Sequence, residues 1–155
     1  MAEPLDPRAL LAHVKDLPIA DFAPGSVIVA AGTASGKLMV LRAGRVEVSI
    51  EGVVLGTLEA AGSVIGEIAA LLGRAHTADV RALEPSSVHV ADAAGALAGN
   101  PFLARHIAAV LAQRLDLVNH RLVELRRELD AHAPKSILDE SVDYLAKVAL
   151  LGAFA

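Results

Sequence analysis

The sequence predicts a mainly β fold with flanking helices: an antiparallel barrel or jelly roll, then a long helix and a short last helix. Between residues 26 and 90, short β-rich runs follow one another at close spacing, separated by glycine turns, which is typical of such folds. From residue 101 onward, apolar residues recur every three or four positions, which indicates a helix. A length of 155 residues is enough for one domain with its own core.

Composition and charge exclude several classes of protein. Hydrophobic residues make up 54% of the chain and aromatic residues 3%, which suits a globular domain and excludes a disordered chain. A net charge of −4 argues against general affinity for nucleic acid, and the lack of cysteine excludes disulfides and thiolate metal sites. The amino terminus lacks the basic start and apolar run of a signal peptide, and no apolar run is long enough to span a membrane. We therefore expect a cytoplasmic protein with no membrane partner.

A short amino-terminal helix is predicted over residues 7–15. Leu10 and Val14 lie at helical spacing, and Asp6 and Pro7 are a suitable N-cap and first-turn pair. Residues 17–22 are expected to form a connector before the first strand.

Seven short strands are expected after this connector. Residues 45–50 alternate apolar and polar side chains, which is the period of a half-buried strand. Glu51 and Gly52 are a typical two-residue hairpin turn. The predicted strands cover residues 26–29, 38–41, 45–50, 53–55, 64–65, 77–83 and 87–90.

The stretch from Gly66 to Val80 has the form of an anion cradle. Gly66 and Glu67 open a short apolar helical turn, where backbone N–H groups are unpaired and the helix dipole favours negative charge. Gly66 allows a ligand to approach the backbone closely, and a carboxylate such as Glu67 accepts hydrogen bonds from a sugar hydroxyl. The stretch therefore predicts a site for a ligand that carries both a phosphate and a hydroxyl group.

This stretch resembles the phosphate-binding cassette of the cyclic nucleotide-binding domain family, whose members share a β-roll like that of catabolite activator protein. The family pattern is Gly-Glu-(Leu/Ile)-Ala-Leu, a short loop, then Pro-Arg-(Ala/Thr/Ser)-Ala. The chain has Gly-Glu-Ile-Ala at 66–69 and Ala-His-Thr-Ala at 75–78. His76 thus stands where the family has the arginine that pairs with the cyclic phosphate, and Ala75 stands in place of the proline.

The resemblance covers about residues 20 to 130. Gly32, Gly44 and Gly62 fall where the family's β-roll carries its turn glycines. It implies one cyclic nucleotide-binding-like domain over residues 1–130, with the β-roll at about 20–92 and the long helix at about 101–130. Residues 131–155 would be a helical extension.

The resemblance also implies a role for each candidate ligand-binding residue. Gly66 would form the turn and Glu67 would hold the ribose hydroxyl. The phosphate would be bound by the backbone N–H groups of Ile68 and Ala69 together with His76 and Thr77. Additional candidates are Arg74 as a substitute cation, the apolar side chains of Val54, Val64 and Ile65 beside the base, and Asn119, which in activator-like members reaches the base in the partner subunit.

Each of these roles has a plainer alternative. Glu67 complements a helix dipole in many proteins without binding a ligand. His76 is either a phosphate contact when protonated or a loop histidine in a site that has lost its ligand. Arg74 and Asn119 are alternatively solvated side chains, and Thr77 is alternatively an ordinary strand residue.

The long helix is predicted to begin at Asn100 and Pro101, an N-cap and first-position pair. Its later apolar residues form a heptad seam, which is typical of a helix that packs on a partner helix. The seam consists of Leu111, Leu115, Val118, Leu122, Leu125 and Leu129. A last helix, capped by Ser136, carries an apolar face made of Ile137, Leu138, Val142, Leu145, Val148 and Leu151. The 20 or so residues that remain after the long helix are too few for the DNA-reading module of the activators.

The sequence as a whole predicts a regulatory module and not an enzyme, because it contains no catalytic constellation. The six histidines lack metal-ligand spacing, so no metal is expected. We expect the module to bind cyclic AMP or cyclic GMP, to form a homodimer through the long helix, and to signal to a protein effector. The alternative is a structural dimerisation or adaptor domain whose β-roll no longer binds nucleotide.

Overall fold

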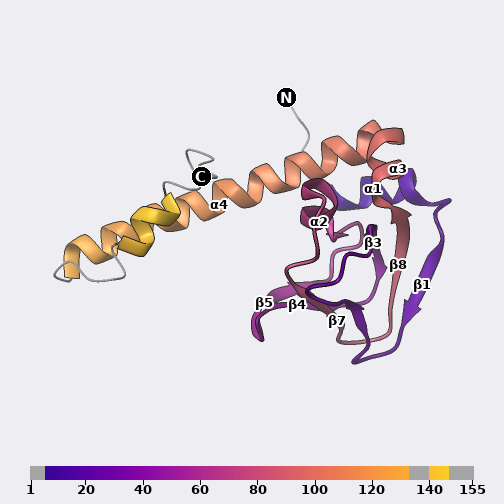
Figure 1. Ribbon diagram of the computed structural model, residues 1–155, viewed down its shortest axis with the longest axis horizontal. Coiled ribbons are helices and arrows are strands. Elements are labelled where there is room, and N and C mark those ends of the chain that lie inside the picture. The colour runs from indigo at the N-terminus through magenta and orange to yellow at the C-terminus, as the bar shows by residue number, and fades with distance from the viewer. Residues whose placement is uncertain (1–5, 133–139, 147–155) are drawn as a thin grey trace. The chain divides into compact units, whose positions relative to one another are not determined.

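Two antiparallel four-stranded sheets form the first part of the chain (Figure 1). The computed structural model describes residues 6–132 and 140–146. One sheet has the order β1-β8-β3-β6 and the other has the order β2-β7-β4-β5. The strands are β1 Ile19–Phe22, β2 Val27–Val29, β3 Lys37–Ala43, β4 Val46–Ile50, β5 Val53–Leu58, β6 Val64–Ile65, β7 Asp79–Ala82 and β8 Ser86–Asp92. The predicted antiparallel roll is confirmed.

Four helices with full bounds accompany the sheets. They are α1 Pro7–Val14, α2 Glu67–Leu72, α3 Ala93–Gly99 and α4 Pro101–His132, and residues 140–146 are also helical. The predicted caps of α1 and α4 are confirmed. The Asp6 side chain accepts a hydrogen bond from the Arg8 N–H at 2.9 Å, and the Asn100 side chain accepts one from the Leu103 N–H at 3.0 Å.

One sequence-based expectation was wrong, and one helix was not predicted. Residues 17–22 are not only a connector, because Ile19–Phe22 form β1, which pairs with β8 in the register Ile19 to His89. The run is short and its partner is distant in sequence, so local pattern did not identify it. The helix α3 was also missed, since its alanine- and glycine-rich sequence has little apolar periodicity; Asp92 caps it by accepting from the Gly95 N–H at 3.0 Å.

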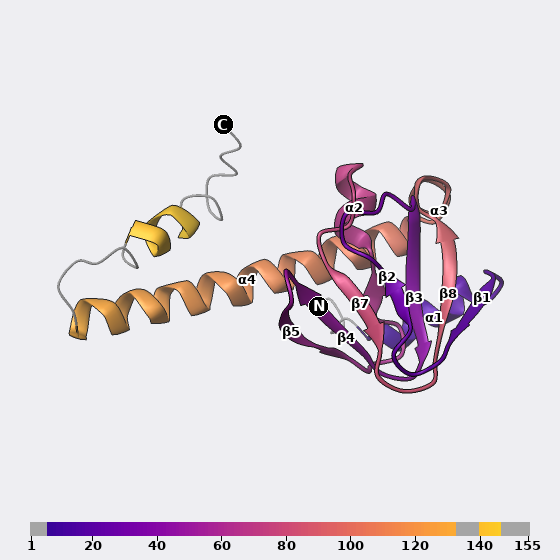
Figure 2. The same cartoon turned by 60° about the horizontal axis from the view of Figure 1, so that its bottom comes forward.

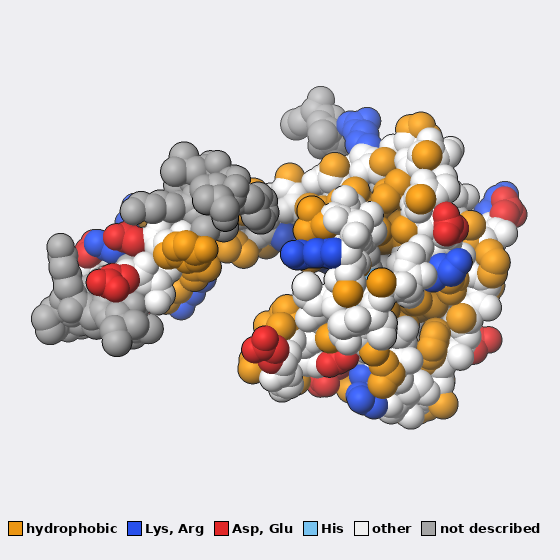
Figure 3. All heavy atoms as spheres, viewed as in Figure 1, with side chains coloured by type: hydrophobic (Ala, Val, Ile, Leu, Met, Phe, Trp, Pro, Cys, Tyr) orange, Lys and Arg blue, Asp and Glu red, His pale blue; other side chains and the backbone are white. Residues whose placement is uncertain are grey.

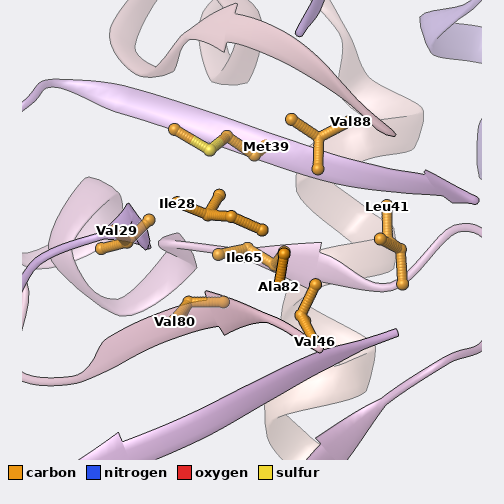
Figure 4. Close-up of a cluster of buried hydrophobic side chains, with 9 residues drawn as sticks. All are labelled: Ile28, Val29, Met39, Leu41, Val46, Ile65, Val80, Ala82 and Val88. Carbon is orange, nitrogen blue, oxygen red and sulfur yellow. The ribbon is translucent and has the colours of Figure 1, made fainter. Parts of the chain in front are cut away.

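The core lies between the two sheets (Figure 4). Side chains from both sheets point toward one another there and exclude water, which is the main stabilising contribution in a small domain. The cluster consists of Ile28, Val29, Met39, Leu41, Val46, Ile65, Val80, Ala82 and Val88. The hairpin between β4 and β5 turns at Glu51 and Gly52, which have φ angles of 50° and 79°, as the two-residue turn prediction requires.

The chain divides into two units, Met1–Ile107 and Ala108–Ala155. The first unit contains the roll, α1, α2, α3 and the start of α4, where Leu103 and Ile107 are fully buried. In the second unit, the seam residues Leu115 and Val118 are exposed, and Arg126 of α4 pairs with Asp143 at 2.9 Å. None of the described helices has the length and apolarity needed to cross a membrane.

The predicted last helix lies partly outside the described residues. Its proposed cap, Ser136, and the apolar positions Ile137, Leu138, Val148 and Leu151 fall there. Val142 and Leu145 lie within the helical residues 140–146, where Val142 is half-buried and Leu145 is exposed.

Candidate functional site

The Gly66–Glu67 turn lies between β6 and α2, at the end of the roll where β3 begins (Figure 2). Gly66 is the N-cap of α2 and has a φ of 87°, in the left-handed region that favours glycine. Gly73 ends the same helix with a φ of 61°. Glycines at both ends therefore permit this short helix to start and stop abruptly.

His76 is held in the loop that follows α2. Its backbone N–H donates to the Thr33 carbonyl at 2.9 Å, and its carbonyl accepts from the Gly32 N–H at 2.8 Å. These two hydrogen bonds connect the loop after α2 with the loop before β3. The side chain is only 6% exposed, so His76 is not the surface loop histidine of the plainer alternative.

The His76 ring is anchored by a serine. Its Nε2 atom lies 2.8 Å from the Ser35 hydroxyl, and the same hydroxyl accepts a hydrogen bond from the Lys37 N–H at 3.2 Å. Sequence analysis did not identify Ser35, because it lies 41 residues from His76 and no motif connects them. Only the long-range closure of the roll brings the two together.

The ring of His76 packs directly on the Gly66 turn. A Cβ atom added at Gly66 would lie 3.0 Å from His76 Cε1 and 3.2 Å from the Lys37 carbonyl. The structure therefore brings together two of the candidate residues, Gly66 and His76. An imidazole, fixed on one side by Ser35, lies against the turn.

The other candidate residues are distributed around this turn and beyond it. Glu67 and Ala69 are buried, whereas Ile68, Arg74 and Thr77 are exposed. Val64 is buried in β6, its neighbour Ile65 belongs to the core cluster, and Val54 is exposed on β5. Asn119 is half-buried on α4, in the second unit.

The described residues on one face of the molecule carry charges of both signs. On the side seen in Figure 3, lysine and arginine side chains are scattered among acidic ones and do not gather into a basic patch. Among the described residues, no group of three or more His, Cys, Asp or Glu side chains is placed to hold a metal ion.

Comparison with known proteins identifies the family. The model of the cyclic nucleotide-binding domain matches residues 19–97, just over half of the 155 residues. The matched segment contains both sheets, α2 and the His76 loop. The chain therefore belongs to the cyclic nucleotide-binding domain family. A comparison with curated proteins finds no match.

Solved structures share the fold at low sequence identity. A structure described as Sp-2Cl-cAMPS bound to PKAR CBD2 is 22% identical, with a TM-score of 0.59 and 80% of each chain covered. The catabolite activator protein of Thermus thermophilus is 21% identical, with a TM-score of 0.63 over 75% of this chain and 58% of that one. The regulatory subunit of a cAMP-independent protein kinase A from Trypanosoma brucei is 20% identical, with a TM-score of 0.55 over 64% of this chain and 35% of that one.

Proposed function

We propose that the protein is a non-catalytic regulatory module that binds a cyclic nucleotide, cyclic AMP or cyclic GMP, at the Gly66–Glu67 turn. The observation that carries this proposal is the packing of the buried His76 ring against Gly66, because a hydrogen-bonding side chain then lies beside the turn that we propose to bind the phosphate. Support also comes from family membership and from a relative of the same fold that holds a cyclic AMP analogue.

The proposed roles follow from the chemistry of each group. The Glu67 carboxylate accepts a hydrogen bond from the ribose hydroxyl. The backbone N–H groups of Ile68 and Ala69 bind the cyclic phosphate, with His76 and Thr77 as side-chain donors. Val64 is proposed to lie beside the base, and Arg74 and Asn119 are further candidate contacts.

We assign the output of the module to α4. This helix starts in the roll unit, where Leu103 and Ile107 are buried, and continues into the second unit. Leu115 and Val118 are exposed there at heptad spacing, and exposed apolar side chains in such a row favour pairing with another helix. We propose a cytoplasmic homodimer that passes the signal to a protein effector through a ligand-dependent shift in population.

Isothermal titration with cyclic AMP and cyclic GMP tests the binding proposal. Replacing His76 with arginine should tighten binding, because arginine adds a permanently charged donor fork. A charge-assisted hydrogen bond contributes about 1.5–3 kcal/mol, so the gain should be roughly tenfold to a hundredfold. His120→Arg adds the same charge at an exposed histidine of α4 and should not tighten binding. Absence of binding at millimolar ligand by both the natural protein and His76→Arg would contradict the proposal.

A second candidate function is an adaptor domain that no longer binds nucleotide. It is favoured by the hydrogen bond between His76 and Ser35, which already satisfies one side of the ring without any ligand. Sedimentation analysis combined with the titration separates the two functions. A dimer that binds neither nucleotide, even with arginine at position 76, would support the adaptor.

A further inference from the structure

The hydroxyl of Ser35 is placed so that it can hold the His76 ring in either of its charge states. A serine hydroxyl has one hydrogen to donate and two lone pairs that accept. The Lys37 N–H occupies one lone pair at 3.2 Å, while His76 Nε2 lies 2.8 Å from the same oxygen. When the ring is neutral and carries its hydrogen on Nδ1, the hydroxyl donates to Nε2. When the ring is protonated, Nε2–H donates to the second lone pair, and the bond is kept.

The other ring nitrogen of His76 lies beside the Gly66 turn. Nδ1 is 3.6 Å from the position that a Cβ of Gly66 would take, and the hydrogen bond to Ser35 involves Nε2 instead. Nδ1 carries a hydrogen in both charge states when Ser35 is paired as above. The ring therefore offers a donor to the turn, and protonation adds a positive charge without moving that donor.

Resting on the proposed function, we infer that anion binding at the Gly66–Glu67 turn is coupled to the uptake of one proton by His76, with Ser35 as a positioning residue. Histidine changes charge in the physiological pH range, and a nearby phosphate favours the charged form of the ring. By linkage, the proton then favours the phosphate to the same extent. An arginine at this position stays charged and would bind without proton uptake.

Other charged groups lie on the elements around His76, and their charge states matter for this coupling. They are Glu67 on α2, Arg74 in the following loop, Lys37 on β3, and Asp79 on β7, whose carboxylate accepts from the Ala31 N–H at 2.8 Å. None of these residue types normally changes charge between about pH 5.5 and 8.5, whereas histidine does. Proton uptake in this range therefore reports on histidine.

Isothermal titration in buffers of different ionisation enthalpy counts the protons taken up when cyclic AMP or cyclic GMP binds. We expect the natural protein to take up a fraction of one proton per ligand between about pH 5.5 and 8.5, in an amount that changes with pH. Its affinity should fall as the pH rises, by at most about tenfold per pH unit, the limit for one proton.

Four variants test which residue takes up the proton and whether Ser35 positions the ring. His76→Arg should bind with an affinity that does not depend on pH and with no proton uptake. His120→Gln, which removes an exposed histidine of α4, should keep the full pH dependence. Ser35→Ala should weaken binding, and Ser35→Thr, which retains the hydroxyl, should restore it.

The possible failures are distinguishable. Binding by the natural protein with a pH-independent affinity and no proton uptake would overturn the coupling and leave the proposed function intact. Proton uptake that persists in His76→Arg would place the proton elsewhere and would also overturn it. Absence of binding at every pH would overturn both proposals together.

Discussion

The two histidines His76 and His106 are buried to nearly the same extent, with 6% and 5% of their surfaces exposed, but their surroundings differ. His76 has a hydroxyl partner 2.8 Å away and faces the Gly66 turn. His106 lies near the start of α4, where its ring centroid is 6.2 Å from that of Phe102. Two equally buried rings therefore have different surroundings: the His76 ring has a hydroxyl partner, whereas burial at a helix junction lowers the pKa of His106.

The region around His106 is built as a structural junction. Phe102 stacks on His13 of α1 at 3.8 Å with an interplanar angle of 10°, and the Asn100 side chain donates to the His13 carbonyl at 3.2 Å. These contacts hold α1 beside the start of α4 (Figure 1). Burial lowers the pKa of His106, and the charge of Asp6 opposes that shift in part. The neutral form of His106 is thus the one that the fold favours.

The largest loss of stability is expected from a substitution in the buried part of this junction. Leu103→Ala removes a fully buried side chain from α4 and should lower the free energy of unfolding by about 2–5 kcal/mol. Leu117→Ala, at an exposed position of the same helix, should change it by less than about 0.5 kcal/mol. Urea denaturation measures both, and equal losses would show that the start of α4 does not contribute to the core.

A smaller loss of stability is expected from substitutions at the Gly66 turn. Gly66→Ala and Gly73→Ala both place a Cβ at a left-handed position of α2, which costs about 1–2 kcal/mol. Only at Gly66 does the added atom meet the His76 ring, since nothing lies within 4 Å of it at Gly73. Urea denaturation should therefore show the larger loss for Gly66→Ala, and only this variant should shift the His76 ring signals in NMR spectra. Similar losses without such a shift would contradict the packing of the ring on the turn.

The smallest expected effect is the contribution of His106 to the pH dependence of stability. The folded protein holds the pKa of His106 below its value in the unfolded chain, so the unfolded state binds more protons as the pH falls below about 6.5. Stability should therefore decrease from about pH 7 to pH 5, and His106→Gln should make that decrease shallower. Urea midpoints at several pH values test this, and an unchanged slope in the variant would exclude His106 as the source.

Local pattern was sufficient for much of the fold and for part of the site. The Glu51–Gly52 hairpin, the caps Asp6 and Asn100, and the turn at Gly66 depend on neighbouring residues, and all were predictable. The pairing of Ser35 with His76 was not, because it depends on how the sheets close and not on a motif. The burial of His76 was missed for the same reason, since loop residues are exposed by default.

The antiparallel pairing of β1 with β8 has a consequence for synthesis of the chain on the ribosome. Residues 19–22 can pair in their sheet only after residues 86–89 have been synthesised. Contacts so distant in sequence slow folding relative to helices of similar stability, and the unpaired strand is open to aggregation in the meantime. A truncation that ends before β8 should therefore leave β1 without its partner strand and make the nascent roll prone to aggregation.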